Sequence, residues 1–427
     1  MHNYLSYIVY ALFLLSILLV AKYAGKNKFH EDSAGLDATL PLRGIAAMGV
    51  VFHHISQETQ FQRAAEMSLF VNVGFLFVAI FMFFSGYGLI KSMDSKPDYM
   101  KGFLRKRLPV IIVPYYVSIL FCTVLALIRH AHFEPVQWVT NSLGLTMINE
   151  YAWYPIVLTF LYIAFYLTFG RIKNRRTCLA IMFGVVVLFG VIFALNGHFV
   201  WWIGEDNWWM SFRHKPEWWQ EQKVFWFSGE WWVNSAIAFW TGLFFACKED
   251  KIRAEFEKSY SFWLVICVLM LMITGAASTV LEITVGYWSE FGGQGPGIIN
   301  KLICFIGQMP LVISFVILIY VILMKVKTGN PVTRFLGKIS LETYMMNYVA
   351  LQITDDIRKW MRTNARNYPA FKMISDNSEA SGRFTYFLLV VVITLLLALL
   401  YRAVNRAMLK RLSRKDQSQI RNEEITK

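Results

Sequence analysis

The chain has 427 residues, of which 56% are hydrophobic and only 16% are charged, and its formal net charge is +14. Soluble domains carry about 25% charged residues, so the composition excludes an ordinary soluble protein and indicates an integral membrane protein with many spans. The positive charge does not indicate nucleic-acid binding, because Lys and Arg form short clusters between apolar runs, without a basic helix or RNA-binding signature. Five scattered cysteines, without paired spacing, predict neither a disulfide framework nor a metal site.

Eleven apolar runs predict an all-α polytopic protein with about ten or eleven transmembrane helices. They cover residues 3–22, 43–57, 68–90, 108–128, 152–170, 177–196, 224–246, 260–286, 299–324, 339–354 and 384–404. The second and tenth runs are short and carry polar residues, which predicts that protein rather than lipid surrounds them. No cleavable signal peptide is expected, because the first run is long enough to span and no basic region precedes it.

The distribution of Lys and Arg predicts the orientation of these spans. The loops after the odd-numbered spans, together with the tail, hold 30 of the 42 basic residues, and the opposite side holds 12. The positive-inside rule therefore places the C-terminus in the cytoplasm of a cell-membrane protein and the N-terminus outside. The loop 355–383 departs from this rule with six basic residues, which indicates a functional basic patch or a miscounted span. Residues 406–427 form a basic cytoplasmic tail, for which we expect partial disorder.

The second span carries the strongest candidate site. Arg43 and His54 are eleven residues apart, so their side chains share one helix face about 16 Å apart along the axis. His53 lies about 80° away from that face. Ionisable residues inside a membrane segment are costly and indicate function, whereas the structural alternative is an interfacial arginine and a histidine bonded to a neighbouring helix. In the predicted orientation, Arg43 lies near the cytoplasm and His54 toward the outer side.

Two further segments carry polar groups beside apolar runs. The third span ends in Phe-Phe-Ser85-Gly-Tyr, and the cluster Arg105-Lys106-Arg107 follows in the next loop. The cluster is suited to binding phosphates, with Arg as a bidentate donor, but an ordinary positive-inside anchor has the same composition. The outer loop 197–232 holds nine of the fifteen tryptophans, which indicates an interfacial aromatic belt or a platform for stacking sugar rings.

These motifs, in this order, resemble membrane-bound acyltransferase family 3, the multi-span O-acyltransferases that acylate cell-surface glycans. The resemblance begins with Arg43 and His54 and continues through the serine-containing span end and the basic cluster before Pro114. Three later stretches are similar to further motifs of that family: Trp153-Tyr154-Pro155, Phe239-Trp-Thr-Gly-Leu243 and Leu336-Gly-Lys-Ile-Ser-Leu-Glu-Thr-Tyr344. The resemblance covers about residues 38–405, and residues 1–37 form an additional N-terminal helix and cytoplasmic loop.

The chain departs from the family pattern at three places. The closing motif of the family usually ends in histidine three residues after the tyrosine, and Asn347 holds that position here. Asparagine can form hydrogen bonds but cannot transfer a proton. A second arginine that often follows the basic pair is absent after Arg107, and the first span precedes the usual start of the family.

The resemblance implies transfer of an acyl group, above all acetyl, from a cytoplasmic acyl-CoA to a hydroxyl of a cell-surface or lipid-linked glycan. It implies that His54 is the general base or acyl carrier and that Arg43 stabilises donor oxygens. The group that stabilises the oxyanion is Ser85, Tyr344 or Asn347, and the sequence does not choose among them.

The implied binding residues fall into two sets. The donor set is Arg105, Lys106 and Arg107, and the acceptor set is Trp153, Glu150 and His53. Acyl-CoA is a substrate in this scheme, and no bound cofactor or metal is expected. The implied partners are the lipid bilayer and the glycan, with no nucleic acid, and the oligomeric state is not indicated.

Two other functions remain compatible with the sequence. A transporter or flippase for a lipid-linked or acidic small molecule would use Arg43 and His54 as a substrate and proton relay, although repeated halves typical of transporters are not evident. A non-catalytic relative is the other alternative, because Asn347 replaces the usual histidine.

Overall fold

The fold was obtained as a computed structural model, which describes most of the chain. The described residues are 21–61, 65–130, 135–144, 147–149, 151–202, 235–286, 298–376 and 378–425, with single positions 8, 11 and 15. Glu150 lies outside these residues. Most of the first predicted span and most of the tryptophan-rich loop also lie outside them.

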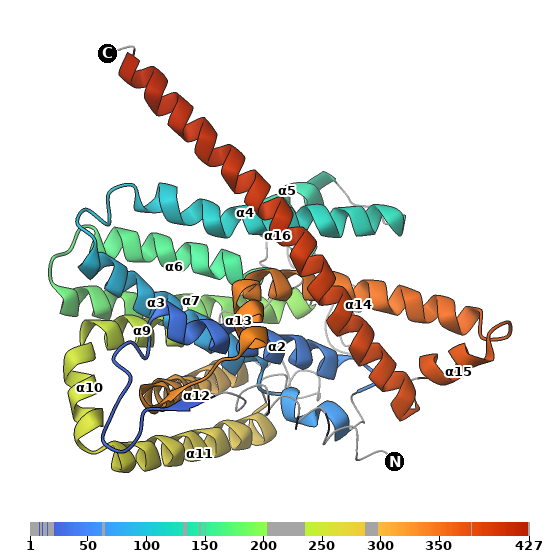
Figure 1. The fold of residues 1–427 in the computed structure, drawn as a ribbon, viewed down its shortest axis with the longest axis horizontal. Helices are drawn as coiled ribbons and strands as arrows, with labels where there is room; N and C mark the ends of the chain where they lie inside the picture. Colours follow the sequence, from blue (N-terminus) through green and yellow to red (C-terminus); the bar gives the residue numbers. More distant parts are fainter. Residues whose placement is uncertain are drawn as a thin grey trace.

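The described residues fold into helices with short connections and one pair of short strands (Figure 1). The elements are β1 (Lys22–Tyr23), α2 (Leu36–Gln57), η1 (Ala65–Phe70), α3 (Gly74–Ser95), α4 (Phe103–Ile128), α5 (Pro135–Leu143), α6 (Trp153–Phe169), α7 (Arg175–Trp202), α9 (Ile237–Cys247), α10 (Glu249–Lys258), α11 (Tyr260–Thr284), α12 (Ile298–Lys325), β2 (Val326–Lys327), α13 (Pro331–Lys338), α14 (Ser340–Thr363), α15 (Pro369–Ser375) and α16 (Ala380–Ile425).

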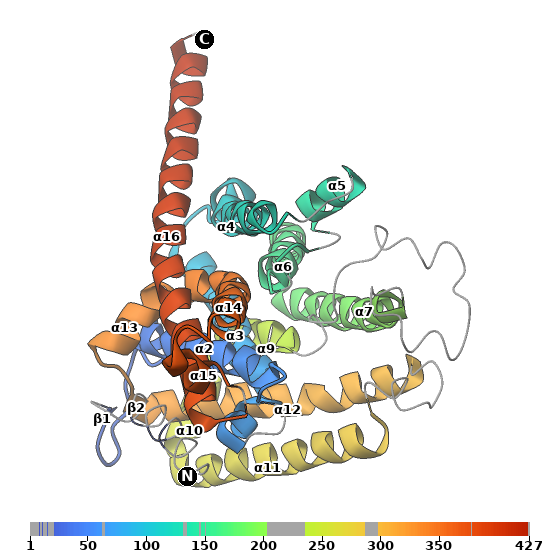
Figure 2. The same cartoon turned by 90° about the vertical axis from the view of Figure 1, so that its right-hand side faces the viewer.

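Six of the described helices are long and apolar enough to cross a membrane, namely α3, α4, α7, α11, α12 and α16. The predicted all-α polytopic class is therefore confirmed. Helices α2, α6, α9 and α14 coincide with other predicted spans but are shorter or more polar. Figure 2 shows α2, α3 and α9 between the helices α4 and α6 on one side and α11 and α12 on the other. Helix α16 continues through most of the predicted tail to Ile425 and projects beyond the bundle.

Ion pairs and a strand pairing join the loops that were predicted to share the cytoplasmic side. Lys91, in the last turns of α3, pairs with Glu249 of α10 at 2.8 Å, and Asp94 of α3 pairs with Arg175 at the start of α7. Strand β1 pairs antiparallel with β2, which brings the loop before α2 beside the loop after α12. The loops after the odd-numbered spans thus meet at one end of the bundle.

The predicted basic loop, residues 355–383, begins within α14 and lies at the opposite end of the bundle. Arg129 at the end of α4 pairs with Asp356 of α14 at 2.8 Å. Arg358 is only 2% exposed and donates to the carbonyl oxygens of Gly382 at 2.5 Å and Ser375 at 2.8 Å. A buried guanidinium needs such acceptors, so at least this cation of the loop holds α14, α15 and α16 together rather than forming a surface patch.

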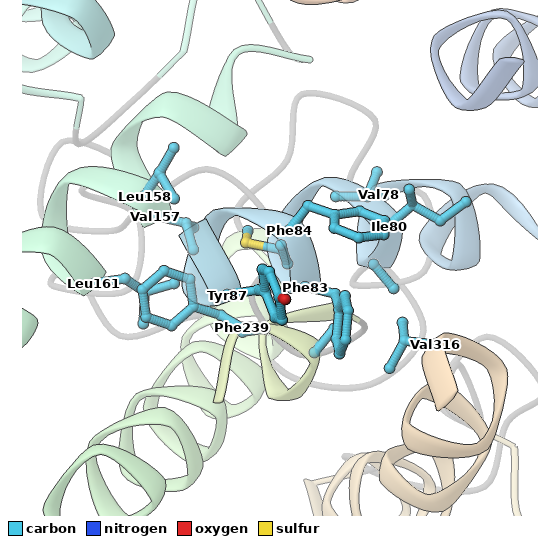
Figure 3. Close-up of a cluster of buried hydrophobic side chains, with 14 of the residues drawn as sticks. Val78, Ile80, Phe83, Phe84, Tyr87, Val157, Leu158, Leu161, Phe239 and Val316 are labelled. Carbon is cyan, nitrogen blue, oxygen red and sulfur yellow. The ribbon is translucent and has the colours of Figure 1, made fainter. Parts of the chain in front are cut away.

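A close crossing of α3 and α9 forms the centre of the hydrophobic core. Figure 3 shows Phe239 of α9 beside Phe83 and Tyr87 of α3 and Leu161 of α6. The backbones meet at glycines: a β-carbon at Gly86 would collide with the carbonyl oxygen of Phe239. Small residues at such crossings let helices in a membrane pack by close van der Waals contact.

Two glycines of α3 should therefore respond differently to substitution. We expect Gly86→Ala to destabilise the protein by about 1–3 kcal/mol, because the added methyl group forces the two backbones apart. Gly88→Ala should be neutral or slightly stabilising, since no atom lies within 4 Å of the β-carbon position. Thermal unfolding of the purified variants compares the two, and equal midpoints would contradict the close crossing.

Candidate active site

The centre of the candidate site is a hydrogen-bonded chain from three helices. His54 of α2 is 7% exposed, and its Nδ1 lies 2.8 Å from Oδ1 of Asn347 on α14. The amide nitrogen of Asn347 donates to the hydroxyl of Thr394 on α16 at 3.3 Å. Asn347 and Thr394 are both fully buried, so each polar group of this chain depends on the next for a partner.

This chain determines which nitrogen of His54 is free. Because the amide nitrogen of Asn347 faces Thr394, its oxygen faces His54 and accepts a hydrogen bond from Nδ1–H. Nε2 then keeps its lone pair and has the capacity to accept a proton. Tyr151 stacks on the imidazole with ring centroids 3.6 Å apart and an angle of 15°, which further limits ring rotation.

His53 faces other elements, in agreement with its helical phase. Its Nδ1 lies 2.9 Å from the carbonyl oxygen of Phe70 at the end of η1, and its ring packs over Gly74 at the start of α3. Trp153, another predicted acceptor residue, is 8% exposed and packs with its edge toward Tyr154 within the core. The structure therefore does not bring His53 and Trp153 into the hydrogen-bonded chain of His54.

Arg43 is half-buried near the other end of α2. Its Nε is buried and has no hydrogen-bond partner within the described part of the chain. The hydroxyl groups of Tyr154 and Tyr162 on α6 lie within electrostatic reach of the guanidinium. A buried polar atom without a hydrogen-bond partner is costly, so the arrangement suits an anionic or strongly polar ligand beside Nε of Arg43.

A close contact between two short motifs positions this arginine. A β-carbon at Gly44 of α2 would collide with the backbone of Gly337 on α13, and a β-carbon at Gly337 would collide with the carbonyl oxygen of Leu40. Helix α13 begins with a capping box of Asn330 and Thr333, which fixes its start. The glycine of the closing motif thus holds α13 against α2 directly beside Arg43.

Polar side chains continue from Arg43 toward the loop between α3 and α4. The hydroxyl groups of Ser85 and Tyr162 are 2.9 Å apart. Arg107 donates to the hydroxyl of Tyr99 at 2.8 Å and lies within electrostatic reach of Tyr162. These side chains form a polar path that leads from Arg107, near the start of α4, to Arg43.

The three side chains of the basic cluster point in different directions from α4. Arg107 is half-buried against Tyr99, whereas Arg105 and Lys106 are exposed. Consecutive residues of a helix point about 100° apart, so α4 cannot direct all three cations at one site. Of the three predicted donor residues, the structure brings only Arg107 to the polar path.

The three candidates for oxyanion stabilisation differ in their hydrogen bonding. Ser85 is engaged with Tyr162, and Asn347 is engaged with His54 and Thr394. Tyr344 is 6% exposed, and its hydroxyl, which lies near the backbone of Tyr154, donates to no acceptor in the described residues. Tyr344 is therefore the candidate whose hydroxyl is still available to a ligand.

Sequence reasoning missed three residues of this site, Tyr151, Tyr162 and Thr394. Thr394 and Tyr162 are polar residues inside strongly apolar runs, and such positions were a usable signal for buried hydrogen bonds. Tyr151 carried no such signal, because it precedes α6 beside a predicted interface where aromatic residues are common.

Comparison with protein families agrees with these motifs. A family model described as an acyltransferase domain, that of acyltransferase family 3, matches residues 41–403. The chain belongs to this family. The match includes α2, α14 and the part of α16 that carries Thr394, so the acyltransferase domain contains every residue of the site described above. No curated protein and no solved structure gives a significant match. The protein is thus a multi-pass membrane member of an acyltransferase family.

The role of Asn347 in this acyltransferase domain is testable by substitution. We expect Asn347→Leu to lower kcat for acyl transfer about 10- to 100-fold, because Nδ1 of His54 loses the acceptor that fixes its tautomer. The donor KM should change little, and Asn347→Asp should restore part of kcat because it retains the acceptor oxygen.

Asn405→Leu provides the matched control, since it removes another buried asparagine of the same bundle. It should affect thermal stability but leave kcat near the wild-type value. A similar loss of kcat in both variants, at equal stability, would contradict the positioning role of Asn347.

Proposed function

We propose that the protein transfers an acyl group, acetyl above all, from a cytoplasmic acyl-CoA to a hydroxyl of a cell-surface or lipid-linked glycan. The observation that supports this proposal is the hydrogen bond from His54 to Asn347, which leaves Nε2 free to act as a base. Arg43, on the same helix, offers a guanidinium whose Nε has no hydrogen-bond partner among the described residues. A base for the acceptor hydroxyl and a cation for an anionic donor are two groups that acyl transfer from acyl-CoA would use.

The donor would enter from the end of the bundle where the loops with most basic residues meet. Arg107 is the cation of the basic cluster that faces the polar path, and phosphate oxygens are its natural ligands. The donor would extend past Ser85, Tyr162 and Arg43 toward His54, and Arg43, about 16 Å from His54 along α2, would bind oxygen atoms of the donor. In this scheme acyl-CoA is a substrate and no other cofactor takes part.

The chemical step moves one proton and exchanges one bond. The acceptor hydroxyl gives its proton to Nε2 of His54 while its oxygen attacks the thioester carbonyl. The carbon–sulfur bond then breaks, and His54 returns the proton to the departing thiolate, so that an ester and a free thiol are formed. Tyr344, three residues before Asn347 on α14, is the group we assign to the developing oxyanion, because its hydroxyl donates to no group in the described residues.

The proposed orientation follows the basic residues. The end of the bundle with Lys91, Arg175 and the loop of Arg107 would face the cytoplasm, and the C-terminus would lie there too. His54 and the loop after α14 would then lie toward the outer side of the cell membrane, where the glycan acceptor is found.

The experiment that tests this function measures release of free thiol from acetyl-CoA by the purified protein in nanodiscs, with and without a crude cell-envelope glycan fraction. We expect glycan-stimulated release in the wild type and a loss of at least 100-fold in His54→Ala, because the base is removed. His53→Ala should keep most of the activity, since His53 bonds a backbone carbonyl elsewhere. Absence of release in the wild type, or equal loss in both variants, would contradict the proposal.

The donor site makes a separate prediction about two adjacent cations. We expect Arg107→Ala to raise the donor KM about ten-fold, since a charge-assisted contact is worth about 1.5–3 kcal/mol. Lys106→Ala should change KM little because its side chain is exposed. Arg107→Lys should rescue only part of the effect, because lysine lacks the planar fork. Steady-state kinetics distinguish these outcomes, and equal KM values for the two alanine variants would place the donor elsewhere.

A further inference from the structure

A groove lies beside the short helix α10, where that helix connects the ends of α9 and α11 (Figure 1). Its volume is about 320 Å³, which is within the range of sites for small molecules. Its walls are largely aromatic, with Phe244 and Phe245 from α9, Phe256 from α10 and Trp263 from α11. These residues belong neither to the polar path nor to the hydrogen-bonded chain of His54, so the groove is distinct from the candidate active site.

The groove lies at the level where this end of the bundle leaves the membrane. Helix α11 is long and apolar enough to span, whereas α10 is short and charged, so the boundary between lipid and water falls between them. Helix α10 buries Phe256 and exposes Lys251 and Lys258, a pattern typical of helices that lie in the membrane interface. Trp263, in the first turn of α11, is of a residue type enriched at that depth. The groove thus opens at the membrane surface, which is the cytoplasmic surface in the proposed orientation.

The aromatic walls offer both apolar surface and one hydrogen-bond donor. Phe244 of the α9 wall is 36% exposed, and an exposed apolar side chain at this depth contacts lipid. Trp263 packs with its ring edge-on to Phe256, with centroids 5.6 Å apart, and its Nε1 has no hydrogen-bond partner among the residues that the structure describes. Buried donors are nearly always paired, so we expect a ligand in the groove to bring an acceptor oxygen to this nitrogen.

Two opposite charges flank the groove on one face of α10. Lys251 and Glu255 both line the groove, both are exposed, and they lie one helical turn apart. Within the described part of the chain they take part in no ion pair, whereas Arg253 on the same helix pairs with Glu257 at 2.7 Å. A lysine that precedes a glutamate by four residues is the weaker order for such a pair, so both charges are available to a ligand.

An apolar groove with a cation and an anion at its edge selects among membrane ligands. A sterol would fill the walls but leave both charges without a partner. An anionic lipid would pair with Lys251 but meet the carboxylate of Glu255. A zwitterionic lipid carries a phosphate for Lys251 and a cation for Glu255, and its fatty chain fits the apolar walls. A primary ammonium suits Glu255 better than a quaternary one, because only the ammonium has hydrogens to donate to the carboxylate.

We propose that this groove binds one molecule of a phospholipid with a zwitterionic primary-amine head group, phosphatidylethanolamine. Its acyl chain packs against Phe244 and Phe256, and an ester or phosphate oxygen accepts a hydrogen bond from Nε1 of Trp263. The phosphate lies at Lys251 and the ammonium at Glu255. The inference goes beyond the proposed function, because the site holds a membrane lipid and not a substrate of acyl transfer.

The test compares lipids that differ only in the head group. Native mass spectrometry is recorded on the full protein, delipidated in detergent and then supplied with phosphatidylethanolamine, phosphatidylcholine or phosphatidylglycerol of identical acyl chains. We expect the occupancy of phosphatidylethanolamine to exceed that of the other two by about three-fold, in keeping with two exposed charge contacts. Lys251→Gln and Glu255→Gln should each lower it to the level of phosphatidylcholine. Glu255→Gln should also raise the occupancy of phosphatidylglycerol, because a repulsive charge is removed.

Matched variants separate this groove from general binding of lipid. Lys258→Gln and Asp250→Asn change exposed charges of the same helix that do not line the groove, so both should bind like the wild type. Trp263→Phe keeps an aromatic ring but loses the donor, so it should lower the occupancy of all three lipids alike. If Trp263→Phe does not fold, Phe244→Glu, which places a charge on the exposed wall, replaces it with the same expected loss.

Three results would overturn the proposed site. Equal occupancy of phosphatidylethanolamine and phosphatidylcholine in the wild type would exclude recognition of the primary amine. Equal effects of Lys251→Gln and Lys258→Gln would exclude the charges beside the groove. Unchanged occupancy in Trp263→Phe, or in its replacement, would place the lipid elsewhere. None of these measurements uses turnover, so a failure of the proposed acyl transfer leaves their outcome unaffected.

Discussion

The need to satisfy polar groups inside an apolar bundle determines how this protein is arranged. An imidazole in such an interior requires a partner from the protein, because water and lipid do not supply one. His54 finds it in Asn347, and the amide of Asn347 in turn requires Thr394. Each bond comes from a different helix, so satisfying one imidazole brings α2, α14 and α16 together. The reactive nitrogen is left free as a consequence of the same bonds.

Satisfied and unsatisfied polar groups are separated along α2. At the His54 end, the hydrogen bonds of Nδ1 are complete and the ring is held by Tyr151. Toward the other end, Nε of Arg43 and the hydroxyl of Tyr344 on α14 are buried and donate to no acceptor in the part of the chain that the structure describes. Unpaired groups of this kind are costly in the free protein, and a ligand that pairs them regains that cost on binding. The ring of His54 is therefore held in one orientation, whereas the Arg43 end of the helix still has polar atoms that a ligand can pair.

Much of the fold could be predicted from the sequence, because long apolar runs are a direct signal of membrane-spanning helices. The six longest spans and the polar character of the second and tenth runs agree with the structure. The alternation of loops also agrees, since ion pairs and the β1–β2 pairing join loops of one predicted side. The continuation of α16 through the tail could not be predicted, because a charged segment next to a span is compatible with either helix or disorder.

Only the parts of the candidate site that lie on a single helix could be predicted from the sequence. The eleven-residue spacing gives the faces of Arg43 and His54 from helical geometry alone. The partner of His54, however, is 293 residues away, and no local pattern connects them. The same limit applies to the basic cluster: its composition predicts three cations, but the packing of α4 decides that only Arg107 faces inward.

The replacement of histidine by asparagine at position 347 has a chemical consequence for the site. A carboxylate or a second imidazole beside His54 would share the positive charge that the ring acquires when it accepts a proton, but an amide is neutral. Asn347 therefore fixes the direction of the ring without stabilising imidazolium by a full charge. Under the proposed function, the oxyanion must then be stabilised by a group other than the pair of His54 and Asn347, and the hydroxyl of Tyr344, about one turn before Asn347 on α14, is the candidate. Orientation of the base and stabilisation of the oxyanion would then both come from α14, one helical turn apart.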